Sequence, residues 1–310
     1  MKVMTSLINW VEIARPKTLI ASISPICIGA VLAKNSLFFS YEIFFVILLT
    51  GIFLQIATNF ANDLFDGKKG ADTLRIGPRR AIASGLISER SMIFALCITL
   101  GIASLFSLLL IPIGGYKVII FLLLGILIAI FYTASPYALA YLGLGDVIVF
   151  FFFGPIATAF TYYLLTSEFS YSSVFAGLAP GAMSTAILVI NNLRDHQFDT
   201  LVNKKTLVVR LGKNFGILEY KICMGIAIAT PLLFVHSTYS THLCILSILF
   251  PLIALRKGSR LRKDTDASKI GSYLPKTALL LFGYTLTFCL CILFLSVSYT
   301  HLRAHETRHD

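Results

Sequence analysis

The chain has 310 residues, of which 57% are hydrophobic and only 13% are charged, and its mean hydropathy is +0.83. Soluble domains carry roughly twice this fraction of charged residues, so the composition excludes an ordinary soluble domain. The formal net charge is +11. In membrane proteins, basic residues mark cytoplasmic loops and contact anionic membrane lipid, so we expect membrane lipid and no nucleic acid as a partner. The six cysteines form no CxxC pair, which argues against disulfides and zinc.

The chain begins with a segment that does not resemble a cleavable signal, because its apolar core starts late and no small-residue cleavage site follows. We expect residues 1–14 to form an amphipathic helix in the membrane interface, with Trp10 as an anchor. A helix needs about 20 apolar residues to cross a bilayer. We count nine apolar segments of suitable length, at residues 18–33, 41–61, 91–112, 117–134, 145–166, 173–193, 216–235, 240–255 and 277–298.

The distribution of basic residues predicts the orientation of these segments. With the N-terminus inside, nearly all of the 26 lysines and arginines fall in or next to inner segments, the exceptions being Lys34, Lys117, Arg303 and Arg308. This bias is the one that the positive-inside rule describes. We therefore expect an all-α, polytopic membrane bundle of about nine transmembrane helices, formed by a single domain over residues 1–298. The polar tail at 299–310 is expected to be disordered or foreign to the protein.

The most informative stretch is QIATNFANDLFDGKKGAD, at residues 55–72, where the second apolar segment ends. Its polar residues recur at spacings of three and four, so they share one face of a helix. These residues are Gln55, Asn59, Asn62, Asp63 and Asp66. Ionisable groups in a membrane segment are costly and are functional candidates for that reason. Two carboxylates one turn apart suit a hard divalent cation such as Mg²⁺.

A second cluster occupies the matching place at the inner end of the sixth apolar segment. Asn191, Asn192, Asp195 and Asp199 again recur at helical spacings. Four segments separate the two clusters, which indicates two pseudo-repeated four-helix units that face one another across a shared site.

Facing carboxylate pairs would repel one another strongly without a cation between them. Divalent ions bridged by substrate phosphate relieve this repulsion, and basic side chains nearby can neutralise the remaining phosphate charge. The candidate cations around the two clusters are Lys68, Arg75, Arg79, Arg80, Arg194, Lys204, Lys205 and Arg210. The pattern therefore indicates a diphosphate that carries an apolar tail, bound near the inner surface.

With both clusters in view, the chain resembles the UbiA superfamily of membrane prenyltransferases, and within it the 1,4-dihydroxy-2-naphthoate prenyltransferases of menaquinone synthesis. The first motif of the superfamily, NDxxDxxxD, matches at Asn62, Asp63 and Asp66, but position 70 is glycine and the third acid is Asp72. This shifted form resembles the naphthoate subgroup. The second motif, NNxRDxxxD, matches in full over residues 191–199. The stretches that carry the resemblance are ARPKT (14–18), residues 55–72, RIGPRRAIASGLIS (75–88), YLGLGDVIVFFFFG (141–154) and NNLRDHQFDTLVNKKTLVVRLG (191–212).

The resemblance implies an Mg²⁺-dependent enzyme of the bacterial cytoplasmic membrane whose site faces the cytoplasm. It would transfer a polyprenyl group from polyprenyl diphosphate to 1,4-dihydroxy-2-naphthoate with loss of carbon dioxide, giving demethylmenaquinol. By the same resemblance, two Mg²⁺ ions would be held by the catalytic carboxylates Asp63, Asp66, Asp195 and Asp199. The substrate-binding candidates are Asn59, Asn62, Lys68, Asp72, Arg80, Asn191, Asn192, Arg194, Lys205 and Arg210.

Other interpretations remain open from sequence. The aromatic acceptor could be 4-hydroxybenzoate or another ring, with the fold and metals unchanged. A membrane transporter is a different class of protein, but its acidic residues would be expected near the membrane midplane on broken helices. Residues at inner helix ends that could contact the aromatic ring are Arg15, Lys17, Tyr132, Tyr141 and Asp146. For the two tyrosines, a place in the aromatic belt at the membrane interface is the favoured alternative.

Overall fold

The computed structural model describes residues 2–68, 81–134, 138–237 and 242–306. Helices make up its regular structure, and no strand occurs in these ranges. Their bounds are α1 Lys2–Ala14, α2 Pro16–Ala33, α3 Tyr41–Lys68, α4 Glu89–Leu108, α5 Ile111–Gly114, α6 Tyr116–Phe131, α7 Gly145–Phe151, the π-helix η1 Phe152–Ile156, α8 Ala157–Thr166, α9 Tyr171–Ala176, α10 Leu178–Leu201, α11 Leu207–Leu211, α12 Lys213–Ser237, the 3₁₀-helix η2 His242–Ile248, α13 Leu249–Gly258, α14 Ala267–Gly271 and α15 Tyr273–Glu306.

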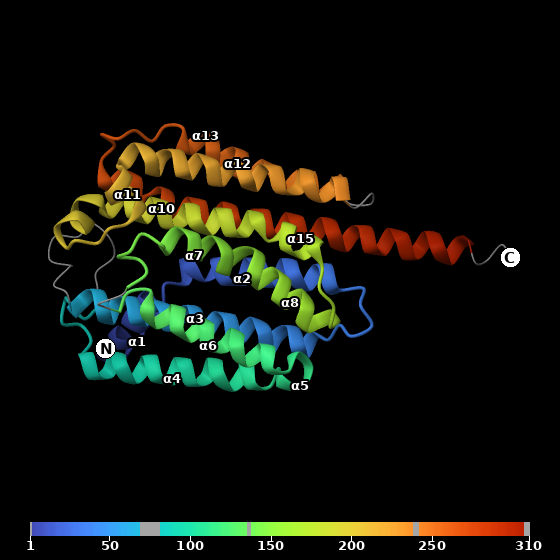
Figure 1. Ribbon diagram of the computed structural model, residues 1–310, viewed down its shortest axis with the longest axis horizontal. Coiled ribbons are helices and arrows are strands. Elements are labelled where there is room, and N and C mark those ends of the chain that lie inside the picture. Colours follow the sequence, from blue (N-terminus) through green and yellow to red (C-terminus); the bar gives the residue numbers. More distant parts are fainter. Residues whose placement is uncertain (1, 69–80, 135–137, 238–241, 307–310) are drawn as a thin grey trace.

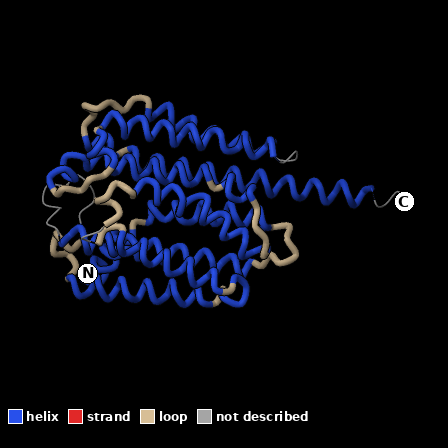
Figure 2. The backbone as a smooth tube through the Cα atoms, viewed as in Figure 1, coloured by secondary structure: helices blue, strands red, loops and turns tan. Residues whose placement is uncertain are grey.

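The long helices lie side by side along the long axis of the molecule, and α15 projects beyond the others at one end (Figure 1; Figure 2 shows the same arrangement by secondary structure). Among the described residues, seven helical segments are long and apolar enough to cross a membrane. Two of the nine expected segments are shorter: α6 has 16 residues, and the segment at 240–255 is divided between η2 and α13. The protein is thus an all-helical integral membrane bundle, and the count of nine spans stays a prediction.

The central helix of the bundle is α10, which carries the second acidic motif. Of its apolar window, 78% is buried inside the protein, against 28–44% for the other six candidate spans. A helix that is apolar on all sides is typically surrounded by other helices. It packs against α12, α7 and α15, whose side chains form the largest apolar core with its own. The polar residues at its inner end are therefore held in a rigid setting.

The N-terminal helix packs on the bundle. The ring of Trp10 meets that of Phe60 on α3 edge-on, with centroids 5.6 Å apart, and Ile13 is buried. Trp10 therefore contacts α3, and its role as an anchor in the membrane interface stays a prediction. At the other terminus, α15 continues to Glu306, through most of the tail for which we expected disorder. Extending an existing helix costs far less than starting one, so a polar tail can prolong an apolar helix. The domain boundary at 298 stays a prediction.

A kink between α7 and α8 brings this segment close to α10. Within η1, Phe153 and Gly154 leave helical geometry, and Pro155 follows. The backbones are so close here that a Cβ atom on Gly154 would lie 2.6 Å from the Gly177 carbonyl oxygen. A Cβ on Gly181 would collide with the carbonyl oxygen of Phe150. Only glycine permits this approach, which sets α7 against the central helix.

We predict that Gly181→Ala destabilises the protein by about 1–3 kcal/mol, the usual cost of overpacking a tight contact. The matched control is Gly225→Ala on α12, where an added Cβ meets no atom within 4 Å. Thermal unfolding of the detergent-purified variants measures the difference. Equal melting temperatures for the two variants would contradict the close approach of α7 and α10.

Candidate active site

The first acidic motif lies on the last turns of α3, and both of its carboxylates are buried. Asp63 accepts backbone hydrogen bonds from Ala81 at 3.3 Å and from Ile82 at 3.1 Å. Asp66 accepts a hydrogen bond from the Tyr141 hydroxyl at 3.3 Å. Asp63 thus fastens the chain that follows the first motif to α3, while Asp66 points toward the loop before α7.

One lysine joins the two acidic motifs. The Lys204 ammonium lies 3.9 Å from a carboxylate oxygen of Asp66 and 3.9 Å from one of Asp199. It also lies 5.6 Å from the centre of the Tyr141 ring. At 3.9 Å these contacts are electrostatic, because hydrogen bonds to a charged nitrogen are shorter. The carboxylates of the two motifs therefore meet at one cation, as expected for two halves that share a site.

The position of Lys204 follows from the way α10 ends. After Val202, Asn203 adopts a left-handed conformation with φ of 54°. Glycine is the residue most often found in this conformation at a helix end, and asparagine also occurs there. The reversal lets the Lys204 amide donate to the Asp199 carbonyl oxygen at 2.8 Å. The side chain of Lys204 therefore lies against the end of α10, close to Asp199, whereas the next residue, Lys205, is exposed.

The second motif contains a strong internal ion pair. Arg194 donates to both carboxylate oxygens of Asp195, each at 2.7 Å, and to the side-chain oxygen of Asn191 at 2.6 Å. Two parallel hydrogen bonds of this kind are among the strongest polar contacts in proteins. All of these side chains except Asn191 are buried. In this structure Asp195 is therefore neutralised from within its own helix.

Four motif residues, Asn62, Asp66, Asn191 and Asn192, border a polar cavity of about 170 Å³ at this end of the bundle, whereas Asp63, Asp195 and Asp199 are outside its wall. Thr133 donates to Asn62 at 3.0 Å, and Asn192 donates to the buried Asp146 at 3.4 Å. The polar and charged residues that line the cavity are Arg15, Thr18, Gln55, Thr58, Asn62, Asp66, Tyr132, Thr133, Asp146, Ser184, Asn191, Asn192, Lys204 and Thr206. They come from both halves of the chain, from α2 and α3 on one side and from α7 and α10 on the other.

An apolar cavity of about 170 Å³ adjoins the polar one. Gln55, Thr58, Ile128 and Phe153 line both, so the two spaces adjoin along α3, α6 and the kink in η1. The apolar cavity reaches Ile47, which is about 28 Å from Asp66 along α3 at ~1.5 Å per residue. The arrangement provides a charged compartment at the end of the bundle and an apolar compartment that extends into the membrane-spanning region.

The donor set fits a magnesium ion that shares its coordination with a ligand. Among the described residues, no group of three or more His, Cys, Asp or Glu side chains is close enough to hold a metal ion alone. Mg²⁺ is usually bound by one or two carboxylates together with substrate phosphates and water, and Asp66 and Asp199 supply such a pair at Lys204. Asp63 and Asp195 currently engage backbone amides and Arg194 instead.

Several predicted residues lie elsewhere. Asn59 donates to the Ala14 carbonyl at 2.8 Å, so it ties the α1–α2 junction to α3 and lies outside the wall of the polar cavity. Lys205 and Arg210 are exposed, and the Arg210 guanidinium bonds the Lys205 carbonyl at 3.1 Å. The side chains of Lys68, Asp72 and Arg80 fall outside the described residues. The roles suggested for these residues stay predictions.

The polar cavity includes residues that the motifs do not mark. Thr133 is one of them, and no spacing rule singles it out, because it follows α6 and reaches Asn62 across the bundle. Lys204 was one of eight nearby cations in the sequence, and its direction depends on the turn at Asn203. Tyr132, Tyr141 and Asp146 were candidates for contact with the aromatic ring. The structure places Tyr132 and Asp146 in the cavity wall, and Tyr141 against Asp66.

Comparison with known proteins agrees with this geometry. The 1,4-dihydroxy-2-naphthoate octaprenyltransferase of Haemophilus influenzae is 37% identical over 257 residues, covering 79% of this chain and 83% of the relative. Proteins of the same name from Escherichia coli and Mycobacterium tuberculosis are 33% and 31% identical, over 86% and 91% of this chain and 89% and 96% of the relatives.

Solved structures share the fold. A UbiA homolog from Archaeoglobus fulgidus bound to DMAPP and Mg²⁺ superimposes with a TM-score of 0.62 at 15% identity, covering 90% of this chain and 98% of that one. The same homolog bound to GPP and Mg²⁺ gives a TM-score of 0.63 at 16% identity, covering 90% and 99%. The profile of the UbiA prenyltransferase family matches residues 22–280, which is most of the chain. This chain therefore belongs to the UbiA prenyltransferase family.

Proposed function

We propose that this protein transfers a polyprenyl group from polyprenyl diphosphate to 1,4-dihydroxy-2-naphthoate, with decarboxylation, and so makes demethylmenaquinol for menaquinone synthesis. The choice of acceptor rests on the relatives that are 31–37% identical and named for this reaction. The choice of reaction class rests on family membership and on the site itself.

The observation that carries the proposal is the junction of a charged cavity with an apolar one. A prenyl diphosphate has a strongly anionic head and a hydrocarbon tail, and these need opposite surroundings. Lys204 and Arg15 provide cations for the head, while Phe153 and Ile128 lead into the compartment for the tail. Because the two compartments adjoin at these residues, we propose that one molecule occupies both, with its head in the charged cavity and its tail in the apolar one.

The reaction balances with the groups named. The bond between the allylic carbon and the diphosphate oxygen breaks, and its electron pair leaves with the diphosphate. The ring carbon that bears the carboxylate forms the new carbon–carbon bond. The bond to the carboxyl group then breaks, its electron pair restores the aromatic ring, and carbon dioxide leaves. The apolar wall of the tail compartment excludes water, which would otherwise capture the allylic cation.

Magnesium fits the leaving-group side of this reaction. We propose that Asp66 and Asp199, with Asp63 and Asp195, hold two Mg²⁺ ions together with the diphosphate. Bound Mg²⁺ would neutralise charge that develops on the departing diphosphate. Lys204 would contribute a further positive charge at the same place, and Arg194 keeps Asp195 oriented on the face of α10.

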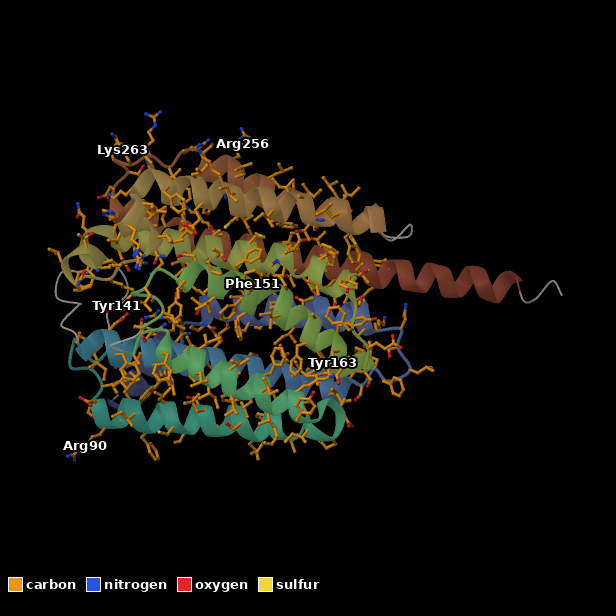
Figure 3. The ribbon with its side chains drawn as sticks, in the orientation of Figure 1. Arg90, Tyr141, Phe151, Tyr163, Arg256 and Lys263 are labelled. Atoms are coloured by element: carbon orange, nitrogen blue, oxygen red, sulfur yellow. The ribbon has the colours of Figure 1, made fainter. Side chains whose placement is uncertain are left out.

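We also propose that the site faces the cytoplasm of a bacterial cell, at its cytoplasmic membrane. Figure 3 shows Tyr141 and the exposed basic residues Arg90 and Lys263 toward one end of the bundle, and Tyr163 toward the other. Basic residues concentrate on the cytoplasmic side of membrane proteins. The site and the positive charge therefore lie at the same end.

The reaction can be tested with membranes that contain the protein, supplied with 1,4-dihydroxy-2-naphthoate, a set of prenyl diphosphates, and either Mg²⁺ or EDTA. We expect a prenylated naphthoquinol and released carbon dioxide with Mg²⁺, and neither product with EDTA, because the diphosphate leaves poorly without the cation. Membranes that lack the protein are the control. Prenylation of 4-hydroxybenzoate in place of the naphthoate would contradict the proposed acceptor.

The acidic motifs should be essential. We predict that Asp66→Ala and Asp195→Ala each lower turnover by roughly 100-fold or more, the scale seen when a group that stabilises transition-state charge is removed. Arg260→Ala, on the exposed surface after α13, is the matched control and should retain wild-type turnover. The measurement is initial rate per amount of membrane-inserted protein. Wild-type turnover in either aspartate variant would exclude a catalytic role for that motif.

The structure favours Lys204 over Lys205 for contact with the diphosphate. We predict that Lys204→Ala reduces kcat/KM for the prenyl diphosphate by about 10- to 100-fold, the equivalent of a lost hydrogen bond to a charged group. Lys205→Ala should lose clearly less, because its side chain is exposed and outside the cavity wall. Melting temperatures of both variants separate this loss from unfolding. A larger loss for Lys205→Ala would reverse the assignment.

A further inference from the structure

Beyond the apolar cavity lies a second apolar space, on the outer face of the bundle. This groove has a volume of about 540 Å³ and lies between α6 and the α7–α8 segment. Ile120, Phe151 and Phe169 line it, and they are 48%, 47% and 64% exposed. In Figure 3 Phe151 and Tyr163 mark two points along it. In a membrane this groove faces lipid.

Two stacked phenylalanines separate the inner cavity from this outer groove. Phe121 of α6 and Phe160 of α8 line both spaces, as does Ile156. The two rings lie nearly parallel, with centroids 3.7 Å apart and 9° between their planes. They form the partition between the compartments without any covalent or charged contact.

The order of residues along α6 shows that the compartments follow one another. Tyr132 lines the polar cavity, Gly125 the inner apolar cavity, and Lys117 the outer groove. Lys117 donates to the Tyr163 hydroxyl at 3.0 Å, so a polar contact closes the far end of the groove. The inner apolar cavity and the outer groove therefore meet at the stacked rings, toward the end of the bundle opposite the charged site.

The inner cavity alone is small for a polyprenyl tail. Pockets that hold drug-sized ligands measure about 300–1,000 Å³, whereas the inner apolar cavity measures about 170 Å³. A short tail fits the inner compartment, but a tail of many isoprene units needs further apolar space. The outer groove is the adjoining apolar space, and the stacked rings stand at its entrance.

We propose that the Phe121–Phe160 stack is a chain-length gate: short prenyl tails end at the stacked rings, and the distal isoprene units of long tails pass between them into the outer groove. This inference rests on the proposed transfer of a prenyl group. The rings act on the distal tail only, so they determine which tail is accepted and leave the bond-making end unchanged.

The test compares farnesyl and octaprenyl diphosphate, as kcat/KM with the naphthoate and as competition for binding to the purified protein. Phe160→Ala removes one ring of the gate and should raise the octaprenyl-to-farnesyl ratio by about tenfold, the lower end of what small volume changes in an apolar pocket produce. Phe160→Trp enlarges the obstruction and should lower the ratio by a similar factor. Phe121→Leu provides a milder opening if either variant fails to insert.

The matched control is Phe106→Ala. Phe106 stacks with Phe53 at 6.1 Å and lines neither the inner cavity nor the outer groove. Its ratio should equal that of the wild type. Ratios within about twofold of wild type in every gate variant would overturn the gate and leave the proposed reaction intact. If the wild type prenylates no acceptor, the proposed reaction fails, and the binding ratios still decide the gate.

Discussion

The structure depends on how it neutralises carboxylates buried at the ends of apolar helices. Charged groups in such surroundings are costly unless they are paired, and the four buried aspartates of the two motifs are paired in three different ways. Asp63 takes backbone amides from the chain beyond α3, Asp66 and Asp199 share Lys204, and Asp195 takes a bidentate arginine from its own helix. Three of these four partnerships reach beyond the aspartate's own helix, so the same charges that form the site also hold its loops in place.

The second constraint is geometric. The kink at Gly154 lets the α7–α8 segment approach the central helix α10 and also brings Phe153 to the wall between the polar and apolar cavities. A straight helix of the same length would present its residues at regular intervals along one line. Here the irregular turn changes the direction of the segment where the charged compartment ends and the apolar one begins. The position of the kink therefore determines where the polar head of an amphiphilic ligand would end and its apolar tail would begin.

Much of this was predictable from sequence, because hydrophobic runs identify membrane helices and spacings of three and four assign residues to one helical face. These two rules were sufficient to place Asp66 and Asp199 at one end of the bundle and to predict that they face a common site. They could not distinguish Lys204 from Lys205, because that choice depends on the left-handed turn at Asn203. They also placed Asn59 on the face of α3 that carries the first motif, although its side-chain amide donates a hydrogen bond to the Ala14 carbonyl at the α1–α2 junction. The periodicity of a sequence predicts neither the conformation of loops nor the contacts between segments that are distant in the chain.

The arrangement of the compartments also explains why the polar residues gather at one end. A diphosphate needs cations and access to the aqueous phase, and its tail needs a long apolar path; a membrane bundle offers both only if the charged site sits at a helix end. Placing Asp66, Asp199 and Lys204 there limits the number of charges that must be buried within the membrane. In the proposed reaction α6 and α8 would accommodate the tail, and the stacked rings of Phe121 and Phe160 line both the inner cavity and the outer groove. If the proposed gate operates, the chemistry at the end of the bundle and the selection of the tail along its length can change independently.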